Sequence, residues 1–372
     1  MENIIFIFIG IIIISIFYAT LYKQKREACI ATILLIILIV LMGGNSDNID
    51  YTIYYNMYNS TFFNKDIGFG TLINISKFIG LDINYFRLMI SVIGLLLLHK
   101  SLIKVTSQKY YFFYLIYFIY PFLFDVVQVR NFLAMSIFIF ATTFLIDNRL
   151  KNKLIYILLV ICAASIQKVA LVYLLVILVV DFEGNKKIYK YGLLFIIVFS
   201  IILGLNKSLT LNFIASLVGQ YTSVLTGVDN YISVNTNYGW IISWFQQIMN
   251  FFIISQIKKC SNLESSVITN EQKRYIKLIY NINLLMFVFL PLYVLDENFT
   301  RIFRNVMPLN WIALCVVTGQ KRMKSILRTK SITRYQLIEL ISMSFAILLF
   351  CLMARDYWES IIINIFTKNW MW

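Results

Sequence analysis

Residues Asp125–Ala134 read DVVQVRNFLA and join two of the most apolar runs in the chain. An acid, an amide and an arginine lie within six residues of this stretch. Burying charge among apolar residues costs free energy unless a partner or a hydrogen bond compensates for it. The surroundings of this stretch therefore decide whether its polar side chains are structural or functional.

The chain has the composition of a membrane protein. Of its 372 residues, 60% are hydrophobic and 14% are charged, and the mean hydropathy is +0.78. Soluble proteins carry about 25% charged residues. The net charge is +15, but the basic residues lie in short clusters between apolar runs. This pattern is typical of orientation in a membrane, and it does not favour nucleic acid as a partner.

The apolar runs predict an all-α polytopic membrane protein, because a spanning helix needs about 20 mostly apolar residues. About twelve transmembrane helices are expected. The two runs that flank Gln167 are short, and they predict either two tight helices or one broken element. The expected helices lie near residues 3–22, 28–43, 86–103, 110–125, 131–146, 154–166, 169–180, 191–206, 241–257, 278–295, 305–319 and 337–353.

Basic residues predict the orientation of these helices. Six alternate connections carry 22 of the 33 lysines and arginines, and such connections stay in the cytoplasm. Both termini are then expected outside. The other connections, together with the N-terminus, carry 11 of the 18 acidic residues. The expected outer segments are 44–85, 125–130, 167–168, 207–240, 296–304 and 354–372.

One transmembrane domain, 1–372, accounts for the chain, with outer-face loops at 44–85 and 207–240. Within these loops, the apolar stretches 67–81 and 209–228 are too short or too polar to span. They are predicted to be re-entrant or to lie at the membrane surface. No cysteine falls in an outer segment, so no disulfide framework is expected.

The first polar constellation of the outer face follows the second apolar run. Asp47, Asp50, Tyr51 and Tyr54 would share one face of a helix with Tyr58. Carboxylates bind sugar hydroxyls, and tyrosine rings stack on the apolar face of a sugar. The alternative is an aromatic belt with helix-capping aspartates.

The second constellation is Gln128, Arg130 and Asn131, at the expected start of the fifth helix. A helix N-terminus presents free N–H groups and the positive end of the helix dipole, which favour phosphate. Arginine adds a bidentate geometry that matches phosphate oxygens. The alternative is that Arg130 pairs with Asp125 and only anchors the helix end.

Two further polar breaks lie at the same expected depth. Arg301 and Arg304 are three residues apart, so they would project together as an anion site. The alternative there is a plain salt bridge between Glu297 and Arg301. The second break holds Gln167 and Lys168, which could equally be a bare loop.

Motifs for nucleotides and metals do not occur in the sequence. It has no Walker A loop, GxGxxG fingerprint, paired CxxC or HExxH, so neither a cofactor nor a metal is expected. The single histidine, His99, stands beside Lys100 at an expected cytoplasmic helix end and is interpreted as an interfacial residue.

In their order along the chain, these motifs resemble the EpsG-like branch of the Wzy-type O-antigen and exopolysaccharide polymerases. The resemblance covers roughly residues 40–180. A late segment with Arg301 and Arg304 is similar as well. The matching elements are Asp50-Tyr51 with Tyr54, Gly68–Asn74, Gln128-x-Arg130-Asn131-x-x-Ala134 and the polar pair before Ala170.

The resemblance implies a multispanning glycosyltransferase similar to the GT-C-like membrane enzymes that use lipid-linked donors. Such an enzyme acts at the outer face of the bacterial cytoplasmic membrane. It transfers a glycan from undecaprenyl pyrophosphate onto another lipid-linked repeat unit. The implied partners are the undecaprenyl-pyrophosphate-linked glycan, as donor and acceptor, membrane lipid and a chain-length regulator.

The resemblance makes Arg130 the expected pyrophosphate ligand and matches Asp50 and Tyr51 to an acidic-aromatic element. Where the family carries a histidine, this chain has Gln167, which cannot accept a proton. The general base is then expected to be Asp50 or Asp47. Otherwise catalysis depends mainly on electrostatic stabilisation of the leaving pyrophosphate.

Two other classes of function remain open from the sequence. A lipid-linked oligosaccharide flippase or other transporter should line a path through the bilayer with polar residues. Here the polar residues gather at one end of the expected helices, which favours an enzyme. An O-antigen ligase, which attaches finished glycan to a lipid core, is the second alternative.

Overall fold

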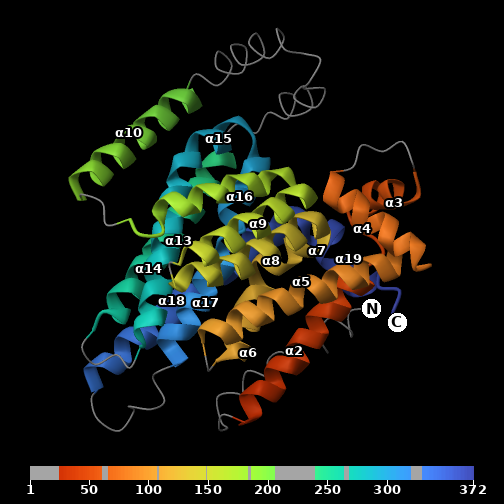
Figure 1. The fold of residues 1–372 in the computed structure, drawn as a ribbon, viewed down its shortest axis with the longest axis horizontal. Helices are drawn as coiled ribbons and strands as arrows, with labels where there is room; N and C mark the ends of the chain where they lie inside the picture. The colour runs from red at the N-terminus through yellow and green to blue at the C-terminus, as the bar shows by residue number, and fades with distance from the viewer. Residues whose placement is uncertain are drawn as a thin grey trace.

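The apolar runs fold as helices that pack side by side in the computed structural model (Figure 1). The structure describes residues 25–60, 66–106, 109–147, 149–182, 186–205, 239–263, 268–319 and 329–372. The helix expected at 3–22 and the apolar stretch 209–228 lie outside these residues.

The described helices, in chain order, are α2 (Lys25–Gly44), α3 (Tyr51–Asn59), α4 (Ile67–Phe78), α5 (Ile83–Val105), α6 (Tyr110–Tyr117), η1 (Phe118–Phe122), α7 (Leu123–Val127), α8 (Val129–Thr142), η2 (Thr143–Asp147), α9 (Leu150–Ile166), η3 (Lys168–Val179), α10 (Lys186–Leu205), α13 (Gly239–Ser261), α14 (Asn270–Met286), η4 (Phe287–Phe289), α15 (Leu290–Leu295), η5 (Glu297–Thr300), α16 (Arg301–Arg304), α17 (Met307–Gly319), α18 (Thr329–Tyr357), η7 (Trp358–Ile363) and α19 (Asn364–Thr367).

Six segments among the described residues are long and apolar enough to cross a membrane. Two shorter apolar helices, Cys29–Gly44 and Lys168–Val179, accompany them. The all-helical membrane fold is therefore confirmed, whereas the expected number of about twelve spans stays a prediction. The six segments are Ile83–Val105, Tyr110–Val127, Val129–Asp147, Asn270–Val294, Asn298–Gly319 and Arg334–Thr367.

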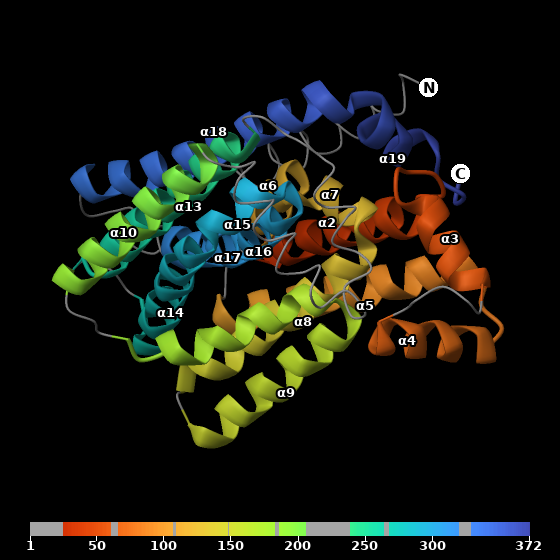
Figure 2. The ribbon, with the colours of Figure 1, turned by 90° about the horizontal axis from the view of Figure 1, so that it is seen from above.

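The centre of the bundle is α17, in which every residue from Met307 to Gly319 is buried. Viewed from above, α17 lies between α18 on one side and α8 and α9 on the other (Figure 2). A helix that is apolar all round is typical of such an enclosed position.

The segment Tyr110–Val127 is kinked, because Pro121 cannot continue a regular helix. The backbone angles of Tyr120 and Pro121 are non-helical. Backbone groups released inside a membrane need another partner. The Trp311 indole donates to the Tyr120 carbonyl at 3.3 Å. The Arg87 guanidinium donates to the Val126 carbonyl, also at 3.3 Å.

The two short runs around Gln167 form separate helices that pack as an antiparallel hairpin. The Tyr156 hydroxyl donates to the Tyr173 carbonyl at 2.6 Å, and Lys153 pairs with Asp181 at 3.4 Å. The 12 residues of η3 are a 3₁₀ helix, and α9 has 17 residues. Because a 3₁₀ helix rises further per residue, the two arms reach similar lengths of roughly 24 and 26 Å.

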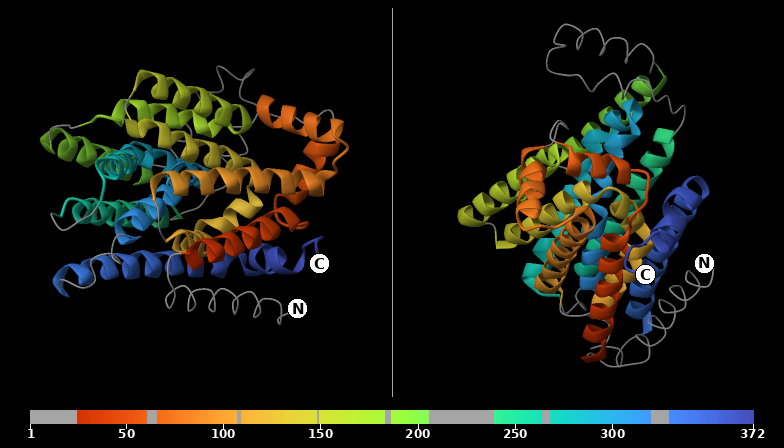
Figure 3. Two further views of the ribbon diagram at one scale, coloured as in Figure 1. Left: turned by 60° about the horizontal axis from the view of Figure 1, so that its bottom comes forward. Right: turned by 90° about the vertical axis from the view of Figure 1, so that its right-hand side faces the viewer.

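Of the segments expected on the outer face, 44–60, 66–85 and 354–372 of the described residues gather at one end of the bundle. There α3 and α4 lie at the same end of the bundle as the C-terminus (Figure 3, left). An isolated antiparallel bridge joins Asn45 to Asn369, and the Trp370 indole donates to the Gly43 carbonyl at 3.2 Å.

Residues in or next to the connections expected in the cytoplasm also meet one another. Lys109 pairs with Glu339, and the Gln272 side chain donates to the Val105 carbonyl at 3.0 Å. The alternation of faces is thus supported by contacts on both sides. Which face is outside stays a prediction.

Candidate functional site

The stretch Asp125–Ala134 contains a break between two helices. Helix α7 ends at Val127, Gln128 has non-helical angles (φ −99°, ψ 55°), and α8 begins at Val129. Arg130 and Asn131 therefore occupy the first turn of α8, as the sequence predicts. The break lets neighbouring side chains of this turn reach different partners.

Gln128 and Asn131 face the late arginine segment. The Arg304 guanidinium donates to the Gln128 side-chain oxygen, and its carbon lies 4.8 Å from the centre of the Phe124 ring. Next to Arg304, Asn305 and Asn131 exchange two side-chain hydrogen bonds of 2.9 and 3.0 Å. Two polar motifs predicted separately from the sequence thus form one interlocked unit.

The pair of buried amides, Asn131 and Asn305, is expected to fix this unit. Replacing either residue by alanine leaves the other amide buried without its partner, which costs about 1–3 kcal/mol. Each single variant should therefore lower the thermal unfolding temperature of the purified protein. The double variant should cost less than the sum of the two. Strict additivity would show that the two amides do not act as a pair.

Arg130 points away from this unit, towards α4. Its guanidinium forms an ion pair of 3.1 Å with Asp66, which also lies 3.8 Å from the Lys168 ammonium. The alternative that Arg130 pairs with Asp125 is wrong. Asp125 is fully buried and accepts a hydrogen bond of 2.7 Å from the Tyr117 hydroxyl.

A close approach of two helices brings Asp66 to Arg130. Gly68, in the first turn of α4, packs against the end of α9, where an added Cβ atom would lie only 2.1 Å from the Ser165 hydroxyl. Glycine is needed where two backbones come so close. The position of Gly68 in the sequence therefore has a packing explanation.

Asp50 lies at the N-terminal end of α3, and its carboxyl group is half-buried. Burial raises the pKa of this carboxyl group above its ordinary value of 3.8. The positive charges of Arg301, Arg130 and Arg87 oppose that rise, in this order of strength. Three arginines from distant parts of the chain thus lie within electrostatic range of one carboxylate.

The other members of the first constellation separate in the structure. Asp47 is exposed, and Tyr51 is half-buried with its hydroxyl donating to Asn84 at 3.1 Å. Tyr54 is buried, its ring lies 6.1 Å from that of Phe69, and its hydroxyl hydrogen-bonds with the Arg130 backbone. The expectation that all of them share one helix face is wrong, because the helix begins only at Tyr51.

Gln167 lies at the tip of the hairpin between α9 and η3. Its side chain is buried, and its oxygen has no hydrogen-bond partner among the described residues. This is the position at which the resemblance leads one to expect a histidine. Glutamine cannot accept a proton. Asp50 is half-buried and lies within electrostatic range of three arginines, whereas Asp66, which is also half-buried, is paired with Arg130.

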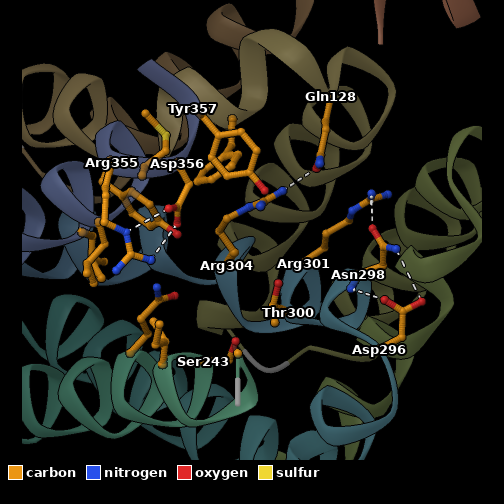
Figure 4. Close-up of a pocket in the computed structure, with 18 residues that line it drawn as sticks. Gln128, Ser243, Asp296, Asn298, Thr300, Arg301, Arg304, Arg355, Asp356 and Tyr357 are labelled. Carbon is orange, nitrogen blue, oxygen red and sulfur yellow. Dashed lines mark hydrogen bonds and ion pairs between the residues drawn. The ribbon is translucent and has the colours of Figure 1, made fainter. Parts of the chain in front are cut away.

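A cavity of about 310 Å³ opens beside Arg304 (Figure 4). Of the residues predicted as functional, it is lined by Gln128, Arg301 and Arg304. Arg301 lines the cavity and also acts electrostatically on Asp50, so it connects the two halves of the site. Its guanidinium donates to the Asn298 side chain at 2.7 Å.

Several residues of the site are not evident from the sequence. The cavity is also lined by Ser243 and Gln246 of α13 and by Arg355 and Asp356 of α18. Arg87 is fully buried in α5, and two of its nitrogens have no hydrogen-bond partner in the part of the chain that the structure describes. An arginine in the middle of an apolar run is a signal that could have identified Arg87.

A bundle of apolar helices with a polar cavity lined by arginines defines a membrane protein with a candidate binding site. The EpsG family model matches residues 28–356, and the chain belongs to the EpsG family. Membership of this family points to a polysaccharide polymerase of the glycosyltransferase type. Neither the curated proteins nor the solved structures compared with the chain gave a match.

Proposed function

We propose that this protein joins undecaprenyl-pyrophosphate-linked oligosaccharide repeat units into O-antigen or exopolysaccharide at the outer face of the cytoplasmic membrane. The observation that carries the proposal is the position of Arg304. Its side chain is 6% exposed, lines the cavity and is held by an amide and an aromatic ring. Among the described residues, no carboxylate lies within ion-pair distance of it.

Arg304 and Arg301 are proposed to bind the pyrophosphate. A buried guanidinium held by neutral groups keeps its positive charge available for an anion, and its planar fork matches phosphate oxygens. The Gln128 amide fixes the direction of the fork. The two arginines would stabilise the negative charge that develops on the pyrophosphate as it leaves.

Arg130 is proposed to act less directly. It is engaged by Asp66, so a phosphate could replace that carboxylate only at an additional cost. Its charge still lies close enough to act on Asp50. We therefore place Arg130 on the side of the proton acceptor and Arg301 and Arg304 on the side of the leaving group.

In the proposed reaction, a hydroxyl oxygen of the acceptor glycan attacks the anomeric carbon of the donor sugar. The bond between this carbon and the pyrophosphate oxygen breaks, and a glycosidic bond forms. The electron pair of the broken bond stays on undecaprenyl pyrophosphate. The hydroxyl proton passes to the ionised Asp50 carboxylate. No other reactant is needed.

The rate of polymerisation is expected to depend on pH through Asp50. Only the ionised carboxylate accepts a proton, and burial raises its pKa above the ordinary value. As the pH is lowered, the rate should therefore begin to fall at a higher pH than it would if the proton acceptor were an exposed aspartate. This is measured as a pH–rate profile of the protein in lipid nanodiscs. A rate that stays constant down to the ordinary pKa of aspartate would remove Asp50 from this role.

The proposed function is tested by deleting the gene and examining the surface glycan on a gel. We expect the lipid core to carry single repeat units only. The longer chains should be absent, and the wild-type gene should restore them. Complete absence of attached repeat units would instead identify a flippase or a ligase.

A further inference from the structure

The cavity beside Arg304 has a second polar wall besides the one with Arg301. In Figure 4 the Arg355–Asp356 pair lies on one side of Arg304, and Arg301, Asn298 and Asp296 lie on the other. The two walls share one cavity of about 310 Å³, which is at the lower end of the range for ligand pockets. A single molecule can therefore touch both walls.

The second wall carries no net charge. The Arg355 guanidinium donates to both oxygens of Asp356, at 2.8 and 3.0 Å, so the opposite charges cancel within the pair. Both side chains are more than half exposed. The pair still presents further N–H groups and carboxylate lone pairs to the cavity. Such a wall suits a neutral ligand rich in hydroxyl groups better than it suits an ion.

The neighbours of this pair have the same chemical character. Ser243 and Gln246 of α13 add a hydroxyl and an amide, both of which can donate and accept. The Tyr357 ring, which packs 5.9 Å from the Phe124 ring, adds an aromatic surface. Hydroxyls, amides and an aromatic ring are the groups that recognise a sugar.

We propose that this wall binds the sugar that is joined directly to the pyrophosphate of the donor. The inference rests on the proposed function, because it places that sugar next to the phosphate ligands Arg301 and Arg304. The wall would then determine which first sugar the enzyme accepts. A neutral wall beside a cationic one accommodates the two chemically different parts of one lipid-linked molecule.

The test compares the binding of two lipids to the purified protein in nanodiscs. One is undecaprenyl pyrophosphate, and the other is the lipid-linked repeat unit extracted from cells that lack the polymerase. We expect the wild type to bind the sugar-bearing lipid at least about 10-fold more tightly. Gln246→Ala and the charge-neutral pair Arg355→Gln with Asp356→Asn should each remove most of this advantage. Both should still bind the sugar-free lipid as the wild type does.

The matched control is Glu359→Gln, an exposed carboxylate on the next turn that does not line the cavity. It should keep the full preference for the sugar-bearing lipid. An unchanged preference in both wall variants would overturn the inference and leave the proposed function intact. If Arg304→Ala bound the sugar-free lipid as tightly as the wild type does, the phosphate site itself would be contradicted. If a wall variant binds neither lipid, the single variant Ser243→Ala takes its place. It is assessed by the same quantity, the affinity for the sugar-bearing lipid relative to that for the sugar-free lipid.

Discussion

Arg304→Ala is expected to abolish long-chain polymer and to lower turnover in nanodiscs by about 100- to 1,000-fold. The reason is that Arg304 is a buried cation in the cavity, held by Gln128 and Phe124 and ready to receive the leaving pyrophosphate. A preorganised charge of this kind acts when negative charge develops on the leaving pyrophosphate. The substitution should therefore lower the rate of the reaction more than it lowers the affinity for the substrate. Single-turnover measurements with the lipid-linked repeat unit separate the two.

Two further variants serve as controls for Arg304→Ala. Arg304→Lys keeps the charge but loses the planar fork, so it should recover only part of the activity. Arg149→Ala removes an exposed arginine at the start of α9, on the opposite face, and should retain normal turnover. Full activity of Arg304→Ala at normal protein levels would exclude Arg304 from the reaction.

Asp50→Asn is the second substitution with a large expected effect, a loss of about 100- to 10,000-fold in turnover. Asparagine keeps the shape of the side chain but cannot take the proton of the acceptor hydroxyl. Binding of the lipid-linked repeat unit should change little. Asp47→Asn provides the comparison, because Asp47 is exposed. If Asp47→Asn rather than Asp50→Asn abolished turnover, the proton acceptor would be Asp47.

The loss in Asp50→Asn should not result from unfolding. The folded protein raises the pKa of Asp50, so the stabilisation linked to this group is present at low pH and is lost as the pH rises through the raised pKa. At neutral pH the ionised carboxylate thus costs stability. The unfolding temperature of Asp50→Asn should therefore equal or exceed that of the wild type. A large decrease would show that Asp50 has a structural role.

The helices and their two faces follow from the sequence because hydropathy and the positions of basic residues act locally. The start of α8 beside Arg130 and the break at Gln167 are visible for the same reason. Interactions between distant residues are not visible. Gln128 and Arg304 lie 176 positions apart, and no spacing rule relates them.

The partner of Arg130 shows the limit most clearly. Asp125 is the nearer acid in sequence, yet Asp66 is the partner because Gly68 lets α4 approach α9. The polar wall contributed by α13 and α18 is hidden in the same way, since Gln246 and Asp356 have no pattern in common. Both depend on how the helices pack.

The central claim, that Arg301 and Arg304 hold the pyrophosphate, is tested most directly by an experimental structure with undecaprenyl pyrophosphate bound. The phosphate oxygens should lie in the cavity, within hydrogen-bond distance of the two guanidinium groups. Phosphates that instead displace Asp66 from Arg130, with Arg304 still bound to Gln128 alone, would contradict the account.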